Sequence, residues 1–267
     1  MTGSGWEWNG FLYSETEIRG KRMGSASVFN YSEIGAREEN EDSVGVEVYG
    51  KNMVAVLADG LGGQGDGKTA SRLTVENLIL CGQDGDFPDA DQIRTVFFNT
   101  NETIFRLCGG TSRMKSTAVY LCIHGTYAIW GHTGDSRLYH FYRIPDGNWE
   151  LRHYTLDHSI SQLAVYMGEI TREEIPQHPG RNRLIHVLGG EETYCEIQEP
   201  VALEKGMHGF LLCTDGFWEN IDENDICRQL LDSKSAREWV ERMLRSIHKN
   251  GKIFQDNNSA IAILLEV

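Results

Sequence analysis

Acidic residues stand beside three apolar runs of this chain. Asp59 follows MVAVLA, Asp215 follows FLLCT, and Asp256 precedes NNSAIAILL. Short apolar runs of this kind predict buried strands, so these carboxylates are expected at strand ends, where they can meet at one rim of a sheet. Converging carboxylates repel unless a cation lies among them, and Mg²⁺ and Mn²⁺ prefer oxygen ligands. The pattern predicts a divalent metal site; the alternative is that each aspartate only begins a turn.

Length and charge limit the class of protein. A chain of 267 residues with 40% hydrophobic content can bury one large core, and without a linker or repeat we expect one domain. A net charge of −14 argues against nucleic acid and against an anionic membrane surface. No apolar run approaches the roughly 18–20 residues that cross a bilayer, and the N-terminus lacks the pattern of a signal peptide. We therefore expect a soluble, cytoplasmic protein.

Six cysteines are scattered without a C-x-x-C pair, which argues against a cysteine zinc site and a disulfide framework. Their spacing also argues against a phosphatase with a cysteine nucleophile, which needs an arginine six residues after the cysteine. Cys108 comes closest, but Arg113 lies one position too near.

Periodicity predicts a mixture of hairpins and helix pairs. Strands are expected at 24–30, 44–49, 53–58, 209–214 and 258–267, and four strands within 117–154 are expected to form a meander. Helices are expected at 68–80, 90–107, 222–231 and 235–249. Hairpins with separate helix pairs indicate antiparallel sheets covered by helices, an α+β fold.

A set of short motifs then occurs in a specific order. They are REENEDS (37–43), ADGLGG (58–63), STAV (116–119), GDSR (134–137), DHS (157–159), His178-Pro179 with Arg181-Asn182, CTDG (213–216) and Asp256-Asn257. This order resembles the type 2C metal-dependent serine/threonine protein phosphatases in their compact bacterial form. The resemblance covers about residue 24 to the C-terminus and implies a four-layer α-β-β-α sandwich.

The extent of the resemblance divides the chain into two segments. Residues 24–267 are expected to form the phosphatase domain. Residues 1–23, which carry several aromatic side chains, lie outside the resemblance and are an N-terminal extension of unknown role. They are expected to be either an extra edge strand or a mobile tail.

The resemblance implies a site for two Mn²⁺ or Mg²⁺ ions. Asp59 would bridge both ions, with the backbone carbonyl of Gly60 as a further ligand. Asp215 and Asp256 would complete the shell of one ion. Two cations held close together activate a water for attack on phosphorus, so no covalent phosphoenzyme is needed.

The REENEDS segment is expected to supply three further groups. Arg37 can hold two phosphate oxygens at once, and the resemblance gives it that role; the alternative is an ion pair with a neighbouring glutamate. Glu41 and Asp42 point to opposite faces if the segment is extended, so they should do different work. By resemblance, Glu41 holds one metal largely through water and Asp42 supports that shell.

Two positions leave alternatives open. Asp135 would join Asp215 at a third, weaker metal by resemblance, whereas a salt bridge to Arg137 or a turn are the other interpretations. Leu61 stands where eukaryotic relatives have a histidine that is a plausible general acid. His178, in a segment that resembles the flap of the family, is the substitute we consider, and water on a metal is the other donor.

The implied activity is hydrolysis of phosphoserine and phosphothreonine in protein substrates, as part of bacterial signal transduction. The substrates would be targets of a serine/threonine kinase, and the enzyme is expected to be a monomer. Two rival hypotheses remain. Gly62 to Thr69 reads GGQGDGKT, a literal match to the phosphate-binding loop of nucleotide hydrolases. The chain could also be an inactive phosphatase-like regulatory module, although such modules typically lose a metal-binding aspartate.

Overall fold

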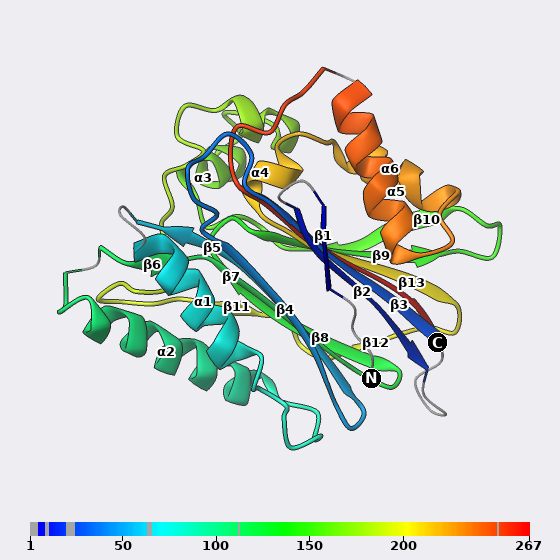
Figure 1. Ribbon diagram of the computed structural model, residues 1–267, viewed down its shortest axis with the longest axis horizontal. Helices are drawn as coiled ribbons and strands as arrows, with labels where there is room; N and C mark the ends of the chain where they lie inside the picture. Colours follow the sequence, from blue (N-terminus) through cyan, green and yellow to red (C-terminus); the bar gives the residue numbers. More distant parts are fainter. Residues whose placement is uncertain (1–4, 9–10, 20–24, 63–65, 112, 250) are drawn as a thin grey trace.

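The computed structural model describes residues 5–8, 11–19, 25–62, 66–111, 113–249 and 251–267. Two antiparallel sheets stack face to face, and helices cover the outer face of each (Figure 1). The predicted α+β sandwich with four layers, α-β-β-α, is confirmed.

Each sheet combines strands that are distant in sequence. The first sheet has the order β1-β2-β3-β14-β13-β9-β10. Its strands are β1 (Gly5–Trp8), β2 (Phe11–Arg19), β3 (Ser25–Glu33), β14 (Asn258–Glu266), β13 (Met207–Cys213), β9 (Arg137–Arg143) and β10 (Trp149–Tyr154). The second sheet has the order β11-β8-β7-β5-β4, with β12 paired to β8 and β6 to β5. Its strands are β11 (Glu196–Ile197), β8 (Tyr127–Thr133), β7 (Ala118–His124), β5 (Asn52–Leu61), β4 (Asp42–Tyr49), β12 (Val201–Ala202) and β6 (Lys115–Ser116).

The helices divide between the two outer faces and one end of the sandwich (Figure 1). α1 (Asp66–Leu78) and α2 (Ala90–Leu107) cover the second sheet, and α5 (Glu223–Leu231) and α6 (Ala236–Lys249) cover the first. α3 (Ile160–Tyr166), the 3₁₀ helix η1 (Arg172–Gln177) and the short α4 (Asp215–Trp218) lie toward one end. α2 matches its predicted range because Asp89 and Gln92 form a capping box at its first turn.

Strand β5 shows why a nearly continuous apolar run is needed in the middle of the sandwich. Met53 and Leu57 face the other sheet, whereas Val54 and Val56 face α1 and α2. Alternate residues of a strand point to opposite faces, and here both faces are covered. Every side chain from Asn52 to Ala58 is therefore buried, which fixes the end of this strand within the fold.

The meander predicted over 117–154 is wrong in one respect. β7 and β8 belong to the second sheet, but β9 and β10 belong to the first. The chain crosses between the sheets after Thr133, through Gly134, Asp135 and Ser136. Strand periodicity does not distinguish a hairpin from such a crossing, because both sheets accept the same alternation.

The N-terminal segment adds two strands beyond the predicted domain. β2 pairs antiparallel with β3, and β1 pairs with β2 at the sheet edge. The described part of 1–23 thus has the form of extra edge strands; residues 1–4, 9–10 and 20–24 lie outside the described residues. None of the helices that the structure describes is long and apolar enough to cross a membrane.

Candidate active site

A cleft of about 620 Å³ is lined by residues at or just beyond the ends of strands from both sheets. Segments from six parts of the chain line it: Ala36 to Glu39 with Glu41, Asp59 to Gly62, Asp135, Asn182 with Leu184, Asp215, and Asp256 with Asn257. The cleft therefore brings together most of the residues that the sequence proposed for the metals, together with Arg37.

Strand register explains this convergence. In the first sheet Cys213 pairs with Arg137 on one side and with Ala260 on the other. The segments just beyond these residues carry Asp215, Asp135 and Asp256, so three aspartates reach the same rim. Asp59 comes from the facing sheet; it lies inside β5, which continues to Leu61 rather than ending before the aspartate as predicted.

Asp42 lies behind this rim and is held by two hydroxyl groups. Its Oδ2 accepts hydrogen bonds from Ser259 Oγ at 2.7 Å and Thr214 Oγ1 at 3.0 Å. Its Oδ1 is buried and has no hydrogen-bond partner among the described residues. Burial raises the pKa of Asp42 to about 7, and the nearby Asp215 adds to the shift.

The aspartates at the cleft, of which Asp135 is buried and Asp59 and Asp215 are partly buried, repel one another as well. Burial raises the pKa of Asp59 and of Asp135 well above the usual range, with neighbouring carboxylates as further causes. Burial also raises the pKa of Asp215 to about 7, followed by repulsion from Glu219. A group of buried and partly buried carboxylates with raised pKa values fits hard divalent cations, because the positive charge offsets both the repulsion and the cost of removing charge from water.

Glu41 has the separate position that its alternation with Asp42 predicted. Burial, followed by repulsion from Glu39, raises the pKa of its carboxyl, whereas the backbone amides of Lys68 and Gly67, in the first turn of α1, act in the opposite direction. A helix N-terminus favours a negative charge, which holds Glu41 at the cleft.

The glycines around this turn allow a close approach of backbones. A Cβ atom on Gly60 would lie 2.0 Å from the carbonyl oxygen of Gly67. No larger residue fits at Gly60, which supports close packing of β5 against α1 as the role of the glycine run. Residues 63–65 of the GGQGDGKT match lie outside the described residues. The antiparallel pairing of β5 with β4 and β7 argues against the nucleotide-hydrolase interpretation, whose loop serves a parallel sheet.

Arg37 and Asn257 organise the entrance. Arg37 Nη2 contacts Asp256 Oδ2 at 2.6 Å, and 57% of the Arg37 side chain is exposed. The partner of Arg37 is thus an expected metal ligand rather than a glutamate.

Sequence reasoning gave Asn257 no role. Its Oδ1 accepts from the Glu41 amide at 2.8 Å, and its Nδ2 donates to the carbonyl oxygens of Ile34 and Glu39. Asn257 thereby fixes the loop that carries Arg37 and Glu41; its place next to Asp256 was the available signal.

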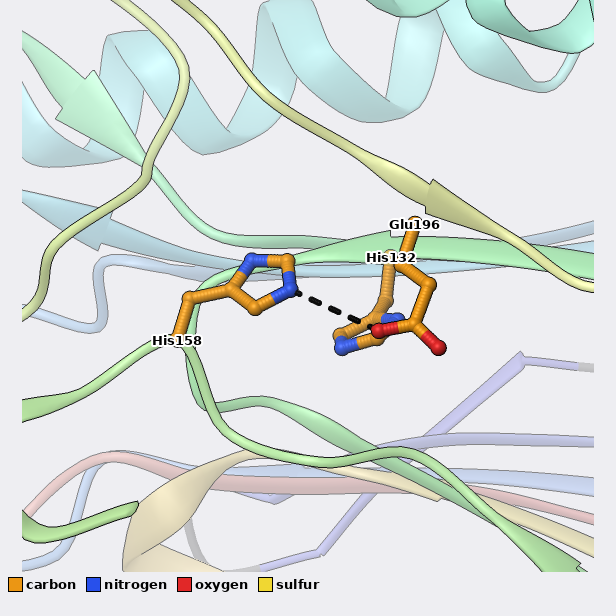
Figure 2. Close-up of side chains that lie close together, drawn as sticks. All are labelled: His132, His158 and Glu196. Carbon is orange, nitrogen blue, oxygen red and sulfur yellow. Dashed lines mark ion pairs between the residues drawn. The ribbon is translucent and has the colours of Figure 1, made fainter. Parts of the chain in front are cut away.

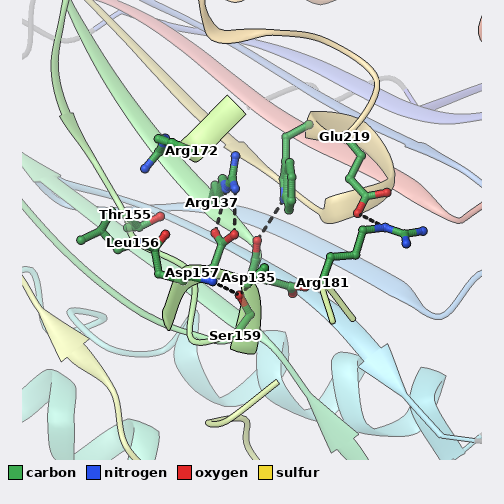
Figure 3. Close-up of polar contacts among 12 residues, drawn as sticks. Asp135, Arg137, Thr155, Leu156, Asp157, Ser159, Arg172, Arg181 and Glu219 are labelled. Atoms are coloured by element: carbon green, nitrogen blue, oxygen red, sulfur yellow. Dashed lines mark hydrogen bonds and ion pairs between the residues drawn. The ribbon is translucent and has the colours of Figure 1, made fainter. Parts of the chain in front are cut away.

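A buried network supports the loop of Asp135 (Figure 3). Arg137 makes two contacts of 2.7 Å with Asp157, so the proposed salt bridge between Arg137 and Asp135 is wrong. The Arg137 guanidinium lies 3.4 Å from the centroid of the Trp218 ring, and Trp218 Nε1 donates to the Asp135 carbonyl oxygen at 3.0 Å. Since Trp218 belongs to the short helix that begins at Asp215, the network fixes Asp135 relative to Asp215.

His178 does not line the cleft. Its Nδ1 accepts a hydrogen bond from the Gly180 amide at 3.1 Å, which places the ring proton on Nε2. The following turn is tied to the site, because Arg181 Nε contacts Glu219 Oε1 at 2.8 Å and Glu219 lies four residues after Asp215 (Figure 3). The segment is thus connected to the carboxylates through Arg181 rather than through His178.

Comparisons with known proteins identify the class. No protein-family model matches the chain. A protein phosphatase 2C-type protein of Streptococcus pyogenes is 30% identical over 237 residues, which cover 85% of this chain and 92% of the relative. The chain therefore belongs to the type 2C family of metal-dependent serine/threonine protein phosphatases.

Solved structures agree with this assignment. The structure of the Mycobacterium tuberculosis serine/threonine phosphatase PstP matches with a TM-score of 0.75 and 26% identity, over 91% of this chain and 99% of that chain. A structure of the PstP catalytic domain in complex with two manganese ions has the same fold, with a TM-score of 0.70 and 24% identity over 90% and 99% of the two chains. The resemblance to phosphatases found in the sequence is confirmed.

Proposed function

We propose that the cleft hydrolyses phosphoserine and phosphothreonine in proteins, with the carboxylates that line it as its metal ligands. The observation that carries this proposal is the convergence of Asp59, Asp135, Asp215 and Asp256 from separate elements beside Arg37. When bound, two Mn²⁺ or Mg²⁺ ions supply the positive charge that activates a water for attack on phosphorus. The two manganese ions in the PstP structure support this cofactor.

The chain's own residues have distinct parts in this proposal. Asp59 comes from β5 of the second sheet, whereas Asp135, Asp215 and Asp256 come from segments at the ends of first-sheet strands. Asp59 would be the ligand that the two ions share, with the Gly60 carbonyl as a further ligand. Asp215 and Asp256 hold one ion, and Glu41 helps to hold the other. Asp42 would support the shell of the ion that Glu41 helps to hold. Thr214 and Ser259 bond to its Oδ2, so its Oδ1 is left to accept a hydrogen bond from a ligand of that ion.

Arg37 binds the phosphate oxygens in this proposal. Its guanidinium is exposed at the cleft and bonded to Asp256 through one nitrogen, so other N–H groups remain to donate to the substrate. A phosphate bound by Arg37 would lie in the same cleft as the proposed metal ligands.

Asp135 is the proposed ligand of a third, weaker ion that it shares with Asp215. Burial and then repulsion from Asp215 raise the pKa of Asp135, and the Trp218 network fixes the two residues relative to each other. The release of this mutual repulsion is what supports binding of a third cation.

The substrates are phosphoproteins, and we propose that they are targets of a serine/threonine kinase. We also propose that the enzyme acts as a monomer in the cytoplasm. All six cysteines are free thiols, which suits a reducing compartment. Size-exclusion chromatography with light scattering tests whether the enzyme is a monomer, and cell fractionation tests whether it is in the cytoplasm.

Phosphate release from a phosphothreonine peptide tests the proposed activity. We expect turnover that depends on added Mn²⁺ or Mg²⁺ and no comparable hydrolysis of ATP. Asp59→Asn should abolish turnover, whereas the control Asp232→Asn should retain it, because Asp232 is exposed at the end of α5. Hydrolysis of ATP with no action on the peptide would support the nucleotide-hydrolase alternative, and a fully folded but inactive wild type would support the regulatory one.

A further inference from the structure

A second group of metal-binding side chains lies outside the carboxylate cleft (Figure 2). His132 comes from β8, His158 from the segment after β10, and Glu196 from β11. His132 and Glu196 are cross-strand partners, so their side chains emerge on the same face of the sheet. One donor atom from each of the three residues lies within 4.8 Å of the others, and none of the three lines the cleft.

His132 is already in the form that a metal ion requires. Its Nε2 lies 2.8 Å from the carbonyl oxygen of Leu156. A carbonyl only accepts, so Nε2 must carry the proton and Nδ1 keeps its lone pair. The pKa of His132 is lowered to about 4, mainly by burial, so the ring is neutral near pH 7. Histidines that bind metals commonly donate their other N–H to a backbone carbonyl in this way.

His158 has a nitrogen without a partner. The residue is 9% exposed, and its Nε2 is buried with no hydrogen-bond partner among the described residues. The nearest carboxylate oxygen, Glu196 Oε2, is 3.9 Å away, which is too far for a hydrogen bond. Buried polar atoms rarely lack a hydrogen-bond partner. A water or an ion between His158 and Glu196 would therefore remove the free-energy cost of the unpaired Nε2.

We propose that His132, His158 and Glu196 form a second metal site, which takes a zinc-class divalent cation. Two imidazoles and one carboxylate are a typical three-ligand set for Zn²⁺, with water as the fourth ligand. The cleft, by contrast, offers oxygen atoms that suit Mg²⁺ and Mn²⁺. The two sites should therefore select different ions.

The geometry allows the three donors to close around an ion. Ligand bonds of about 2.0–2.2 Å require donor atoms roughly 3.3–3.5 Å apart. His158 Nε2 and Glu196 Oε2, at 3.9 Å, must therefore move closer together. Glu196 can supply the movement, because its side chain is 55% exposed. One contact opposes binding: the Gly134 amide lies 3.3 Å from His158 Nδ1, which must take the ring proton when Nε2 binds the metal. We therefore expect weaker binding than at closed cysteine zinc sites.

An ion in this position would join three segments near the catalytic loop. His158 donates its backbone N–H to the Gly134 carbonyl at 2.9 Å, and Gly134 precedes Asp135. Asp157, which precedes His158, pairs with Arg137 in the supporting network. Zinc would thus brace the crossing between the sheets without entering the carboxylate cleft.

Cobalt absorption spectroscopy tests the proposal, with Co²⁺ as the probe and Zn²⁺ as competitor, in protein saturated with Mg²⁺. Tetrahedral Co²⁺ with nitrogen ligands absorbs visible light far more strongly than octahedral Co²⁺ with oxygen ligands. We expect one strongly absorbing Co²⁺ per chain, displaced by Zn²⁺. Glu196→Gln should weaken binding at least about tenfold, and His158→Gln should abolish the intense band.

Controls separate this site from the cleft and from loss of folding. His248→Gln, at the exposed end of α6, should leave the band unchanged, and Asp59→Asn should retain it although the cleft is disabled. Circular dichroism checks folding; if His158→Gln unfolds, Glu196→Gln decides, because that side chain is half exposed. An absent band in folded wild type, or an unchanged band in Glu196→Gln, would overturn the proposal.

Discussion

Asp42 and Asp59 lie directly opposite each other in the antiparallel pair of β4 and β5. Like charges at opposed positions destabilise a sheet, and here burial also raises the pKa of both carboxyl groups. After burial, repulsion from Asp42 is the largest cause of the raised pKa of Asp59. The metal-free site is therefore a source of instability that cations relieve.

Asp42→Asn should stabilise the metal-free protein. The amide oxygen can still accept from Thr214 and Ser259, while the buried negative charge is removed. We expect the midpoint of thermal unfolding at pH 8 to rise by a few degrees, since each kcal/mol is worth roughly 2–4 °C in a chain of this size. Added Mn²⁺ should raise the midpoint of the wild type more than that of the variant. A lower midpoint for metal-free Asp42→Asn would show that the Asp42 carboxylate is stabilising.

Arg37→Ala should separate phosphate binding from metal binding. The pair with Asp256 is exposed and contributes little to folding, so the affinity for Mn²⁺ should change little. Loss of charged hydrogen bonds to phosphate, worth about 1.5–3 kcal/mol, should lower kcat/KM for a phosphopeptide about 10- to 150-fold. Arg72→Ala, on the exposed face of α1, is the matched control and should keep full activity. Equal losses in metal affinity and turnover would mean that Arg37 mainly positions Asp256.

His178→Ala tests the prediction that His178 donates the proton to the leaving group. An alkoxide needs that proton and p-nitrophenolate hardly does, so a general acid should matter for phosphopeptides by about 10²–10⁴-fold and little for p-nitrophenyl phosphate. Equal losses on both substrates would indicate that His178 holds the turn to Gly180 and Arg181, to which it is hydrogen bonded. No loss on either substrate would leave it as a surface residue.

A buried histidine pair should make stability depend on pH. His140 Nε2 lies 3.0 Å from His208 Nδ1, and His208 Nε2 bonds to the Glu204 carbonyl, so each ring is held neutral. Burial, with repulsion from His208, His153 and Arg152, lowers the pKa of His140 to about 3. The unfolded state takes up the proton first as pH falls below 6.5, and His140 then costs up to about 1.4 kcal/mol of stability per pH unit until its folded pKa is reached.

His140→Gln should flatten this dependence between pH 6.5 and 4.5, measured by urea unfolding at fixed Mg²⁺. The change in slope, rather than the stability at one pH, is the test, because the variant can also alter packing against Phe210. The same slope in wild type and variant would contradict the assignment.

Local patterns in the sequence predicted much of this molecule. Periodicity and motif order predicted the range of α2, the hairpin of β4 and β5, and the position of Asp59, Asp215 and Asp256 at one rim. The crossing at Asp135 was not predictable, because the choice of sheet depends on pairing between β9 and β13, which are about 70 residues apart in the chain.

The supporting contacts were harder still to foresee. The pair of Arg137 and Asp157 joins the GDSR and DHS motifs, whose contact depends on the folded chain. Helix α4, which carries Trp218, is too short to show a helical period in the sequence. His132, His158 and Glu196 share no short ligand spacing, so only the folded structure brings them together.

Calorimetric titration of Mn²⁺ into wild type and Asp59→Asn tests the central claim most directly. If Asp59 bridges the two ions, wild type should bind at least two Mn²⁺ per chain, and Asp59→Asn should lose this binding together with phosphopeptide turnover. Excess chelator should likewise abolish wild-type turnover. Unchanged Mn²⁺ affinity in Asp59→Asn, or full turnover in chelator, would contradict the account.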